Sequence, residues 1–435
     1  MKVDNWGSYP SIDGQHITPP SVEGMQELLR STTTLIPRGN GRCYGDSALA
    51  TTMISTRQLT ALLDFDSERG VVTAEAGLLL DDLLEYIVPH GWFLPVVPGT
   101  KMITLGGAIA SNVHGKNHHQ AGAFGDYILS FNLVDEKGAL KTCSREEHPS
   151  LFAHTIGGYG TTGIIVSATL QLQSITATYY YQQSFHASNL VDMLRLFDTH
   201  RQSPYLVAWL DGLAADTRAG GGILHTGHKC ELTDLPSALQ SAPLLLHRPP
   251  RIKIPKLPTS WLMNKLSLRL NNGLYYWQHR HGEQSRIVHY SQFFFPLDAL
   301  QNWKHLYGPA GLLQYQFVVP KDKAEPCISE VFQLIRRARI TPYLMVLKTM
   351  GARSAHAAAT DFPMPGYSLA IDFKHTPTTR AFLDVLDQSI LKYQGRVYLT
   401  KDARLPAATF RQMYPEAQQI PGRFRSLQSI RIYDL

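Results

Sequence analysis

A glycine-rich turn near the N-terminus is the first part of the sequence that could bind a ligand. It runs from Arg38 to Asp46 and contains three glycines, at positions 39, 41 and 45. Glycine lets a backbone pass close to a ligand and lets its N–H groups point at phosphate oxygens. The pattern therefore fits a phosphate-binding loop, with a tight surface turn as the alternative.

A second segment, from 98 to 119, combines small residues with histidines. Gly106 and Gly107 open a run of small residues, which suits a helix or turn packed against a flat ligand. His114, His118 and His119 fall within six residues, which raises the question of a metal site. No Cys or carboxylate stands at a matching spacing, so we expect no metal and interpret the histidines as the polar wall of a pocket.

A third segment matches the pattern G-x-G-x-x-G between Gly158 and Gly163. In a dinucleotide-binding turn this pattern follows a strand and opens a helix. Here a helix-like stretch precedes it, a strand at 164–172 follows it, and no Asp or Glu lies near position 183 to bind a ribose. The sequence therefore argues against a Rossmann-type NAD site.

A lysine close to the C-terminus is a candidate catalytic residue. Lys401 comes at the end of a strand-like stretch and stands beside Asp402 and Arg404. A lysine in such a place can act in catalysis or bind an anion. On the spacing alone, a solvated surface lysine is the alternative.

Length and composition indicate a globular protein of two domains. The chain has 435 residues, 44% of them hydrophobic and 17% charged, which excludes a disordered protein. No apolar run approaches the roughly 18 residues that cross a bilayer, and we see no apolar leader segment. The four cysteines lie far apart, so we expect neither zinc nor disulfides and favour a reducing cytoplasm.

The net charge of +6 is concentrated in one stretch. Between Leu245 and Tyr290 there are eight basic residues and one acid, so the rest of the chain is close to neutral. This predicts an anionic partner at one place and argues against nucleic-acid binding. Residues 243–272 also contain four prolines between Pro249 and Pro258, then Trp261, Leu262 and Met263. We expect a long mobile basic loop with a short amphipathic helix, lying over the pocket.

The secondary structure predicted around these residues differs between the first third of the chain and the region beyond residue 176. The first third alternates strands, predicted at 35–37, 71–76, 127–134 and 164–172, with helices at 21–30 and 79–88. Beyond residue 176, strands are predicted at 289–295, 312–319, 343–348 and 367–373, and helices at 298–306, 328–338 and 379–393. This mixture indicates a one-sided antiparallel sheet with helices on one face.

The order of the motifs resembles the flavin domain of the vanillyl-alcohol oxidase superfamily: RGxG at 38–41, PGT at 98–100, TxGGAIA at 104–110 and GGxGxTGII at 157–165. The strings HGKNHH at 114–119, YGPAG at 307–311, LQYQF at 313–317 and KDAR at 401–404 are more specific. They are similar to the polyprenylphosphoryl-ribose oxidases, the flavin subunits of polyprenylphosphoryl-ribose 2-epimerases. The resemblance spans residues from about 35 to 415.

This resemblance implies an α+β protein with a PCMH-type FAD-binding fold. It implies an FAD-binding domain at 1–175 and a substrate or cap domain at 176–405, built on an antiparallel sheet flanked by helices. A C-terminal segment, 406–435, would return to the FAD-binding domain.

The resemblance also implies FAD as the cofactor. The residues that match the family's flavin contacts are Arg38, Gly39, Asn40, Gly41, Arg42, Cys43, Tyr44, Gly45, Asp46, Ser47, Gly99, Thr100, Thr104, Leu105, Gly106, Gly107, Ser111, Asn112, Val113, His114, Ile165 and Tyr398. Many superfamily members tether FAD through a histidine in the first turn. Arg42, Cys43 and Tyr44 fill that stretch here, so we expect non-covalent FAD, with a thioether to Cys43 as the alternative.

The implied reaction is oxidation of the 2-hydroxyl of a polyprenylphosphoryl pentose to a keto intermediate, for an arabinose precursor in cell-wall biosynthesis. Lys401, His114 and Tyr44 would be catalytic, with Lys401 or His114 as the base. The remaining substrate contacts would be Trp209, Phe294, Gln314, Gln316 and Lys348. Phe294 and Ala370 stand where the family pattern has Tyr and Cys, which alters the shape of the pocket.

Two other functions stay open. A soluble alditol or aldonolactone oxidase would share the flavin chemistry but would not need the basic loop. A non-catalytic flavin- or lipid-binding protein would not need Lys401, His114 and Tyr44. For the leading function, the expected partner is an NAD(P)H-dependent keto-reductase that acts next. The expected location is the cytoplasm, with peripheral contact at the inner face of the cell membrane as an option.

Overall fold

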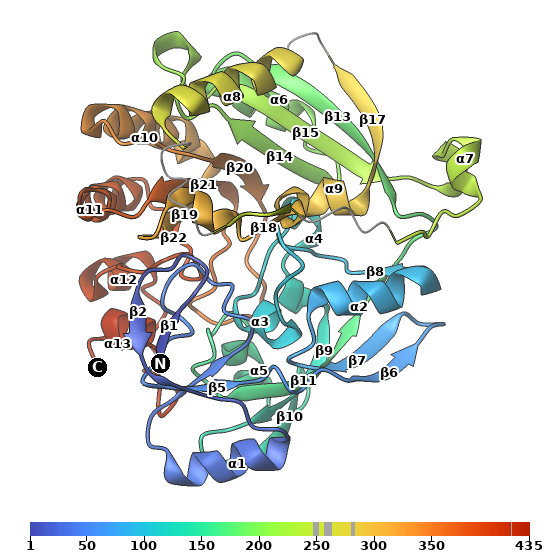
Figure 1. Ribbon diagram of the computed structural model, residues 1–435, viewed down its shortest axis with the longest axis vertical. Coiled ribbons are helices and arrows are strands. Elements are labelled where there is room, and N and C mark those ends of the chain that lie inside the picture. The colour runs from blue at the N-terminus through green and yellow to red at the C-terminus, as the bar shows by residue number, and fades with distance from the viewer. Residues whose placement is uncertain (247–251, 256–262, 280–282, 419) are drawn as a thin grey trace.

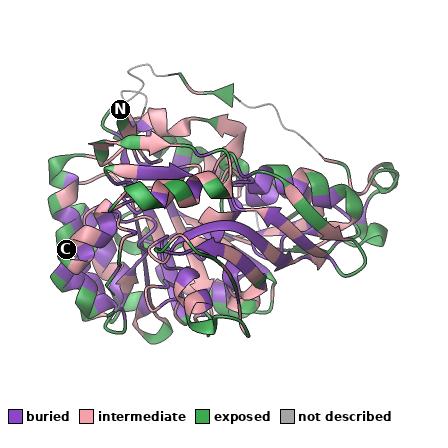
Figure 2. Ribbon diagram, turned by 90° about the horizontal axis from the view of Figure 1, so that it is seen from below, coloured by how far each residue is buried: buried purple, intermediate pink, exposed green. Residues whose placement is uncertain are grey.

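The computed structural model describes residues 1–246, 252–255, 263–279, 283–418 and 420–435. Figure 1 shows one large sheet in the upper half of the view and smaller sheets in the lower half. In Figure 2 the strands of the interior are mainly buried, while the outer sides of the helices are exposed. The arrangement confirms the predicted α+β class.

The N-terminal part folds into a three-stranded parallel sheet, β3-β5-β4, and a five-stranded antiparallel sheet, β10-β9-β11-β7-β6. The strands are β1 (Lys2–Asp4), β2 (Ser11–Asp13), β3 (Gln15–Ile17), β4 (Ile36–Arg38), β5 (Thr52–Ser55), β6 (Leu62–Asp66), β7 (Val71–Glu75), β8 (Trp92–Phe93), β9 (Ile128–Val134), β10 (Leu140–Ser144), β11 (Ile164–Gln171) and β12 (Gln173–Ser174). The helices are α1 (Val22–Ser31), α2 (Leu80–Ile87), η1 (Val88–His90), α3 (Leu105–Ala110), α4 (His118–Ala121), η2 (Phe124–Tyr127) and α5 (Pro149–Thr155).

Local sequence signals account for several of these elements. Helix α1 begins where the Ser21 side chain accepts a hydrogen bond from the Gly24 N–H, which satisfies one of the free N–H groups of the first turn. Its apolar face buries Met25 and Leu29 in a core shared with β4 and β5.

The large sheet is antiparallel and has the order β17-β13-β15-β14-β20-β21-β19-β22. Its strands are β13 (Tyr179–Ala187), β14 (Tyr205–Leu210), β15 (Gly222–Lys229), β17 (Gln284–His289), β19 (Leu312–Pro320), β20 (Met345–Met350), β21 (Gly366–Lys374) and β22 (Arg396–Val397). Helices α6 (Leu190–Thr199), α10 (Ala324–Ala338) and α11 (Pro377–Lys392) share one core with it. The predicted antiparallel sheet is present, but helices cover both faces: on the face opposite this core, Tyr275 of α8 (Lys265–Gln278) packs on Trp209, and Phe293 of α9 (Tyr290–Phe294) packs on Tyr205.

The two faces of the large sheet differ because side chains alternate along each strand. On β19, Leu313, Tyr315 and Phe317 pack into the core beneath the helices, while Gln314 and Gln316 face the opposite way. The sequence alternation in LQYQF thus places two amides on the face that is turned toward the N-terminal part of the chain.

The remaining elements connect or cover these layers. They are η3 (Asp216–Arg218), η4 (Leu232–Asp234), α7 (Ser237–Gln240), β16 (Ile252–Lys253), α8 (Lys265–Gln278), α9 (Tyr290–Phe294), η6 (Pro296–Ala299), β18 (Leu300–Gln301), η7 (Trp303–Tyr307), η8 (Lys321–Lys323), α12 (Ala407–Met413) and α13 (Leu427–Tyr433). Among the described residues, no helix is both long and apolar enough to span a bilayer.

Two predicted elements are wrong. The predicted strand 289–295 is helix α9, which the His289 side chain caps by accepting from the Ser291 N–H. A short continuous apolar run cannot distinguish a strand from a buried helix. The predicted helix 298–306 is broken into η6, β18 and η7, and Asn302 adopts the left-handed region with φ 57°. That residue cannot continue a right-handed helix.

The basic stretch 243–272 is described only in part, because residues 247–251 and 256–262 lie outside the described residues. Helix α8 begins at Lys265, inside this stretch, has 14 residues and continues beyond residue 272, whereas Trp261 and Leu262, beside which the short amphipathic helix was expected, lie outside the described residues. The expected mobility of the stretch stays a prediction.

The C-terminal segment packs against both halves of the chain. Phe410 and Met413 of α12 belong to the core under the large sheet. Farther on, Phe424 forms a bridge with Leu35, and Arg431 of α13 pairs with Asp46 at 2.8 Å. The expected domain limits fall between β12 and β13 and between β22 and α12, and the division stays a proposal.

Candidate active site

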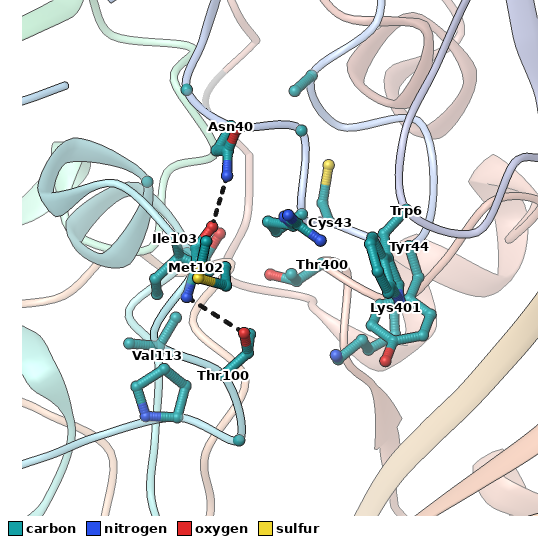
Figure 3. Close-up of a pocket in the computed structure, with 18 of the residues that line it drawn as sticks. Trp6, Asn40, Cys43, Tyr44, Thr100, Met102, Ile103, Val113, Thr400 and Lys401 are labelled. Carbon is teal, nitrogen blue, oxygen red and sulfur yellow. Dashed lines mark hydrogen bonds between the residues drawn. The ribbon is translucent and has the colours of Figure 1, made fainter. Parts of the chain in front are cut away.

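A cavity of about 450 Å³ lies between the glycine-rich turn, the α3 region and the polar face of the large sheet. Figure 3 shows Asn40 and Cys43 on one side, Thr100, Ile103 and Val113 on another, and Tyr44 beside Lys401. The cavity therefore brings together segments that are hundreds of residues apart in the sequence.

The glycine-rich turn presents its backbone to this cavity. Within the described part of the chain, the N–H groups of residues 39–43 donate no hydrogen bond to the protein. Gly41 has φ +59°, and a Cβ there would meet the guanidinium of Arg38. Arg38 is itself buried and donates to the carbonyls of Asp4 and Ala48 at 2.7 and 3.0 Å. Consecutive unpaired N–H groups beside a buried arginine form an anion-binding nest of the kind that holds a pyrophosphate.

The opposite wall is formed by small residues around α3. Thr104 caps the helix by accepting from the Gly107 N–H at 3.1 Å, and Gly106, Gly107 and Ser111 line the cavity. A Cβ at Gly106 would lie 3.0 Å from that of Ala76, so a larger residue here would have to push the two segments apart. Asn40 donates to the Met102 carbonyl at 2.8 Å and ties the glycine-rich turn to this wall (Figure 3).

Lys401 lies inside the cavity, above the ring of Tyr44. The distance from its Nζ to the ring centroid is 3.8 Å, and Figure 3 shows the two side chains together. The Tyr44 N–H donates to the Thr400 carbonyl at 3.0 Å, which fixes the two segments against each other. Burial and the nearby Lys348 lower the pKa of Lys401 to about 7, against an opposing effect of Asp372. Lys401 can therefore exchange a proton near neutral pH.

The turn that carries Lys401 is held by a charged network. Arg431 contacts Asp402 at 3.0 Å and Asp46 at 2.8 Å, and it thereby links the lysine turn to the glycine-rich turn. All three groups are largely removed from solvent, so removal of one partner would leave a buried charge uncompensated.

His114 is buried and fixed by Gln316. The Nε2 of His114 lies 3.0 Å from the Gln316 side-chain amide nitrogen, which also donates to the Ser368 hydroxyl at 3.0 Å. The amide nitrogen can only donate, so His114 accepts through Nε2 and carries its hydrogen on Nδ1. Burial and the nearby Lys348 keep the pKa of His114 well below its usual value. His114 is thus a neutral hydrogen-bond donor, and its Nδ1 has no partner among the described residues.

The three histidines do not converge on one point. His118 accepts from the Gly351 N–H at 3.0 Å through Nδ1, and Nε2 of His119 lies 3.0 Å from the Ser203 carbonyl. Each histidine therefore has its own structural partner.

Lys348 is a cation at the centre of the site. Its charge lowers the pKa values of His114, Lys116, His118 and Lys401. Burial lowers the pKa of Lys348 itself to about 8. Within the described part of the chain, Asp372 is the carboxylate that acts on Lys401. The excess of positive charge suits an anionic ligand.

Asp372 organises the polar floor of the site. Its carboxylate accepts from the Gln314 amide at 2.6 Å and from the Tyr307 hydroxyl at 3.1 Å. Burial raises its pKa to about 6, so it is mainly ionised at neutral pH. Sequence reasoning missed this residue, although it lies two positions from Ala370 on the same face of a predicted strand.

Most of the residues singled out from the sequence line the cavity. These are Arg38, Gly39, Asn40, Gly41, Arg42, Cys43, Tyr44, Ser47, Gly99, Thr100, Thr104, Gly106, Gly107, Ser111, Val113, His114, Ile165, Gln314, Gln316, Lys348, Ala370, Tyr398 and Lys401. Their roles stay proposals, but their convergence is a property of the fold.

Six of the expected residues lie outside the lining. Gly45, Asp46, Leu105 and Asn112 support the walls from behind: Asn112, for example, accepts from the Gly125 N–H at 2.8 Å. Trp209 lies under Tyr275 of α8, with ring centroids 4.8 Å apart, and Phe294 is packed against Tyr180 and Tyr205. The substrate contacts expected for these two residues stay a proposal.

Other lining residues had no sequence signal. Asp298 accepts from the Thr100 hydroxyl at 2.7 Å and from the Lys101 N–H at 2.9 Å, and it joins η6 to the α3 wall. Trp6 and Trp303 pack edge to face at 5.7 Å on the rim. These contacts join distant segments and cannot be read from local patterns.

We expect acid precipitation to release the yellow colour into the supernatant, because FAD should be held without a covalent bond. Cys43 is the cysteine in the described cavity lining, and burial raises the pKa of its thiol. A neutral thiol is a poor nucleophile toward flavin. Flavin that stays with the precipitated protein would contradict this expectation and would implicate Cys43.

Comparison with known proteins agrees with the geometry. The FAD binding domain family matches residues 16–144. Decaprenylphosphoryl-beta-D-ribose oxidase of Mycolicibacterium smegmatis is 33% identical, over 95% of this chain and 88% of its own length. An uncharacterized protein of Streptomyces coelicolor is 31% identical over 78% of this chain and 92% of its own. L-gulonolactone oxidase of Bos taurus is 28% identical over 47% of each chain.

The cavity, its phosphate nest and these matches define an FAD-dependent oxidoreductase that acts on a sugar-like alcohol. FAD fits the site, because the N–H groups of the glycine-rich turn suit its pyrophosphate and the α3 wall is lined by the small residues Gly106, Gly107 and Ser111. Within this class, the chain belongs to the decaprenylphosphoryl-β-D-ribose oxidase family, as the motif order and the specific strings indicated.

Proposed function

We propose that the protein oxidises the 2-hydroxyl of a polyprenylphosphoryl pentose to a ketone. The observation that carries this proposal is Lys401, a partly buried lysine with a pKa near 7, set beside a second partly buried lysine and two amide side chains in an FAD cavity. The combination supplies a proton acceptor, a site for a phosphate charge and hydrogen-bonding groups for hydroxyls. The likeness to the Mycolicibacterium smegmatis enzyme supports the choice of substrate.

Bound FAD would supply the redox chemistry by accepting a hydride from the carbinol carbon. The protein must then remove the hydroxyl proton and hold the sugar in place. We assign proton removal to the neutral form of Lys401. Tyr44 keeps its own proton, because burial holds the pKa of its hydroxyl well above the usual value, and we propose that it positions Lys401.

His114 is less suited to the role of base in this geometry. Its acceptor nitrogen already receives a hydrogen bond from Gln316, so only the Nδ1–H is available. We propose that His114 donates this hydrogen to a ligand oxygen or nitrogen. The sequence left two candidate bases, Lys401 and His114. The arrangement of the site favours Lys401.

Lys348 and the amides of Gln314 and Gln316 would hold the phosphate and the remaining hydroxyls. A cation that is partly shielded from water interacts more strongly with a phosphate, because the local dielectric constant is lower than in bulk water. Ala370 is small and lies between Gln316 and Val346 in the ladder, so it leaves room for a sugar ring above the sheet.

The product chemistry indicates the next partner. A ketone at C2 can be reduced from the opposite face to give the epimeric sugar, which requires a hydride donor. We propose an NAD(P)H-dependent keto-reductase as that partner. We also propose a cytoplasmic location, and a polyprenyl chain that keeps the substrate in a bilayer would bring the enzyme to the inner face of the membrane.

Anaerobic bleaching of the flavin tests this function directly. A short-chain polyprenylphosphoryl ribose should reduce the flavin rapidly, whereas xylitol and an aldonolactone should leave it oxidised. Rapid bleaching by xylitol or the lactone alone would assign a soluble alditol or aldonolactone oxidase instead. No bleaching by any sugar would support the non-catalytic class.

The pH profile of flavin reduction should shift in opposite directions in two variants. The rate should rise with pH as Lys401 loses its proton and level off above about pH 7. Lys348→Met removes a positive charge that lowers the pKa of Lys401, so the profile should move up by about one pH unit. Asp372→Asn removes a negative charge that raises this pKa, so the profile should move down. Shifts of the same sign, or none, would exclude Lys401 as the titrating base.

A further inference from the structure

Helix α8 carries a line of exposed apolar side chains on its outer face. Leu266, Leu270 and Leu274 are 68%, 68% and 55% exposed, and Trp277 is 53% exposed. At about 100° per residue, these four positions share an arc of roughly a quarter of the helix surface. Apolar residues scattered singly are ordinary on a protein surface, but a continuous line of large ones marks an interaction site.

The inner face of the same helix is fixed to the large sheet. Leu268 and Asn272 are buried, and the Asn272 amide donates to Asp211 at 2.7 Å. The Tyr275 hydroxyl lies 2.8 Å from Nε2 of His225 on β15. Figure 1 shows α8 lying across the upper end of the sheet. The apolar line is therefore held outward by a docked helix.

The charges beside this line are positive. Lys265 and Arg269 are exposed, and they lie next to the apolar line along one side of α8. The surrounding stretch between 245 and 290 is the most basic part of the sequence. An exposed apolar line with adjoining lysine and arginine is the pattern of helices that lie in the surface of an anionic membrane.

A second copy of this chain fits the surface less well. A symmetric dimer would pair this surface with the same surface of another copy, and α8 carries a lysine and an arginine but no acidic residue to neutralise them. Like charges in an interface disfavour association, whereas anionic lipid headgroups would neutralise them. The charge thus selects a lipid surface over self-association.

We propose that the outer face of α8, formed by Leu266, Leu270, Leu274, Trp277, Lys265 and Arg269, docks the protein on an anionic lipid membrane. The proposal rests on the proposed function in one respect, since a substrate with a polyprenyl chain gives the enzyme a reason to bind a bilayer. The proposal goes further by naming the surface that makes the contact. Tyr275 on the inner face of α8 packs on Trp209, which pairs across the ladder with Val346 of the cavity lining, so docking brings the site close to the lipid.

Vesicle flotation of the FAD-loaded full chain tests the surface. The wild type should float with vesicles that contain phosphatidylglycerol and much less with pure phosphatidylcholine. The triple variant Leu266→Gln, Leu270→Gln, Leu274→Gln should lose at least about ten-fold in partition coefficient. The double variant Lys265→Gln, Arg269→Gln should lose binding to the anionic vesicles only, and added salt should weaken wild-type binding.

A matched control is Leu140→Gln on β10, which removes a leucine that is 53% exposed at the other end of the molecule. It should float like the wild type. All variants should keep FAD and be reduced normally by a water-soluble short-chain substrate, which separates this proposal from the proposed function. Unchanged flotation of the triple variant would overturn the proposal. So would a change in its oligomeric state with unchanged flotation, which would assign the surface to a second copy.

Discussion

Replacing Lys401 with alanine is expected to slow substrate-driven flavin reduction by about 100-fold or more, the usual scale for the loss of a general base. The protein should stay folded and retain FAD, because the phosphate nest and the α3 wall are formed by other segments. Reduction by dithionite should be unaffected, since it needs no base. Stopped-flow absorbance at saturating substrate measures both rates.

The conservative variant separates the two roles that a lysine can have. Lys401→Arg should not restore the rate, because arginine cannot give up its proton in a protein. Full activity of Lys401→Arg beside an inactive Lys401→Ala would show that the residue supplies charge and no proton transfer. A wild-type rate in Lys401→Ala would move the role of base to His114.

Gly41→Ala is expected to weaken FAD binding by about 100-fold. Residue 41 lies in the left-handed region, and its new Cβ would meet the Arg38 guanidinium that supports the turn. Displacement of the turn would cost one or two hydrogen bonds to a charged phosphate, each worth about 1.5–3 kcal/mol. Titration of the apoprotein with FAD, followed by flavin fluorescence, gives the dissociation constant.

Gly138→Ala is the matched control for backbone strain. Gly138 also has a positive φ, +80°, but the nearest atom to a new Cβ there is the Gln26 carbonyl oxygen at 3.8 Å. Both variants should lose about 1–2 kcal/mol of stability from the left-handed conformation, while only Gly41→Ala should lose FAD affinity. Equal FAD affinity in the two variants would show that the turn does not hold the pyrophosphate.

Periodicity predicted the part of the fold that forms the site. The strands predicted at 312–319, 343–348 and 367–373 are found as β19, β20 and β21. Apolar and polar residues alternate along these segments, which is typical of strands that pack one face on a core. The same rule could have placed Asp372 beside Gln314 in the polar layer. The aromatic run 290–295 carried no alternation, and only its packing in the tertiary structure makes it helical.

The glycine-rich turn and Lys401 were visible in the sequence, but their meeting was not. From the sequence alone, the glycine-rich turn could equally be a tight surface turn, and Lys401 could be a solvated surface lysine. The contact between Tyr44 and Lys401 joins segments more than 350 residues apart in the chain, so local patterns do not predict it. The resemblance implies that Trp209 and Phe294 contact the substrate. In the structure Trp209 packs on Tyr275 of α8 and Phe294 packs on Phe293 of α9, contacts that no local sequence pattern predicts, and their role toward the substrate stays a proposal.

In the proposed reaction, FAD bound at this site would accept a hydride from C2 of a polyprenylphosphoryl pentose. The most direct measurement is anaerobic stopped-flow reduction of the flavin by short-chain polyprenylphosphoryl ribose carrying deuterium at C2, compared with the unlabelled compound and with a compound labelled at C3. A bond broken in the measured step should slow the reaction several-fold for the C2 label and leave the C3 label without effect. An isotope effect at C3 alone, or reduction only by a soluble polyol, would contradict the proposed reaction.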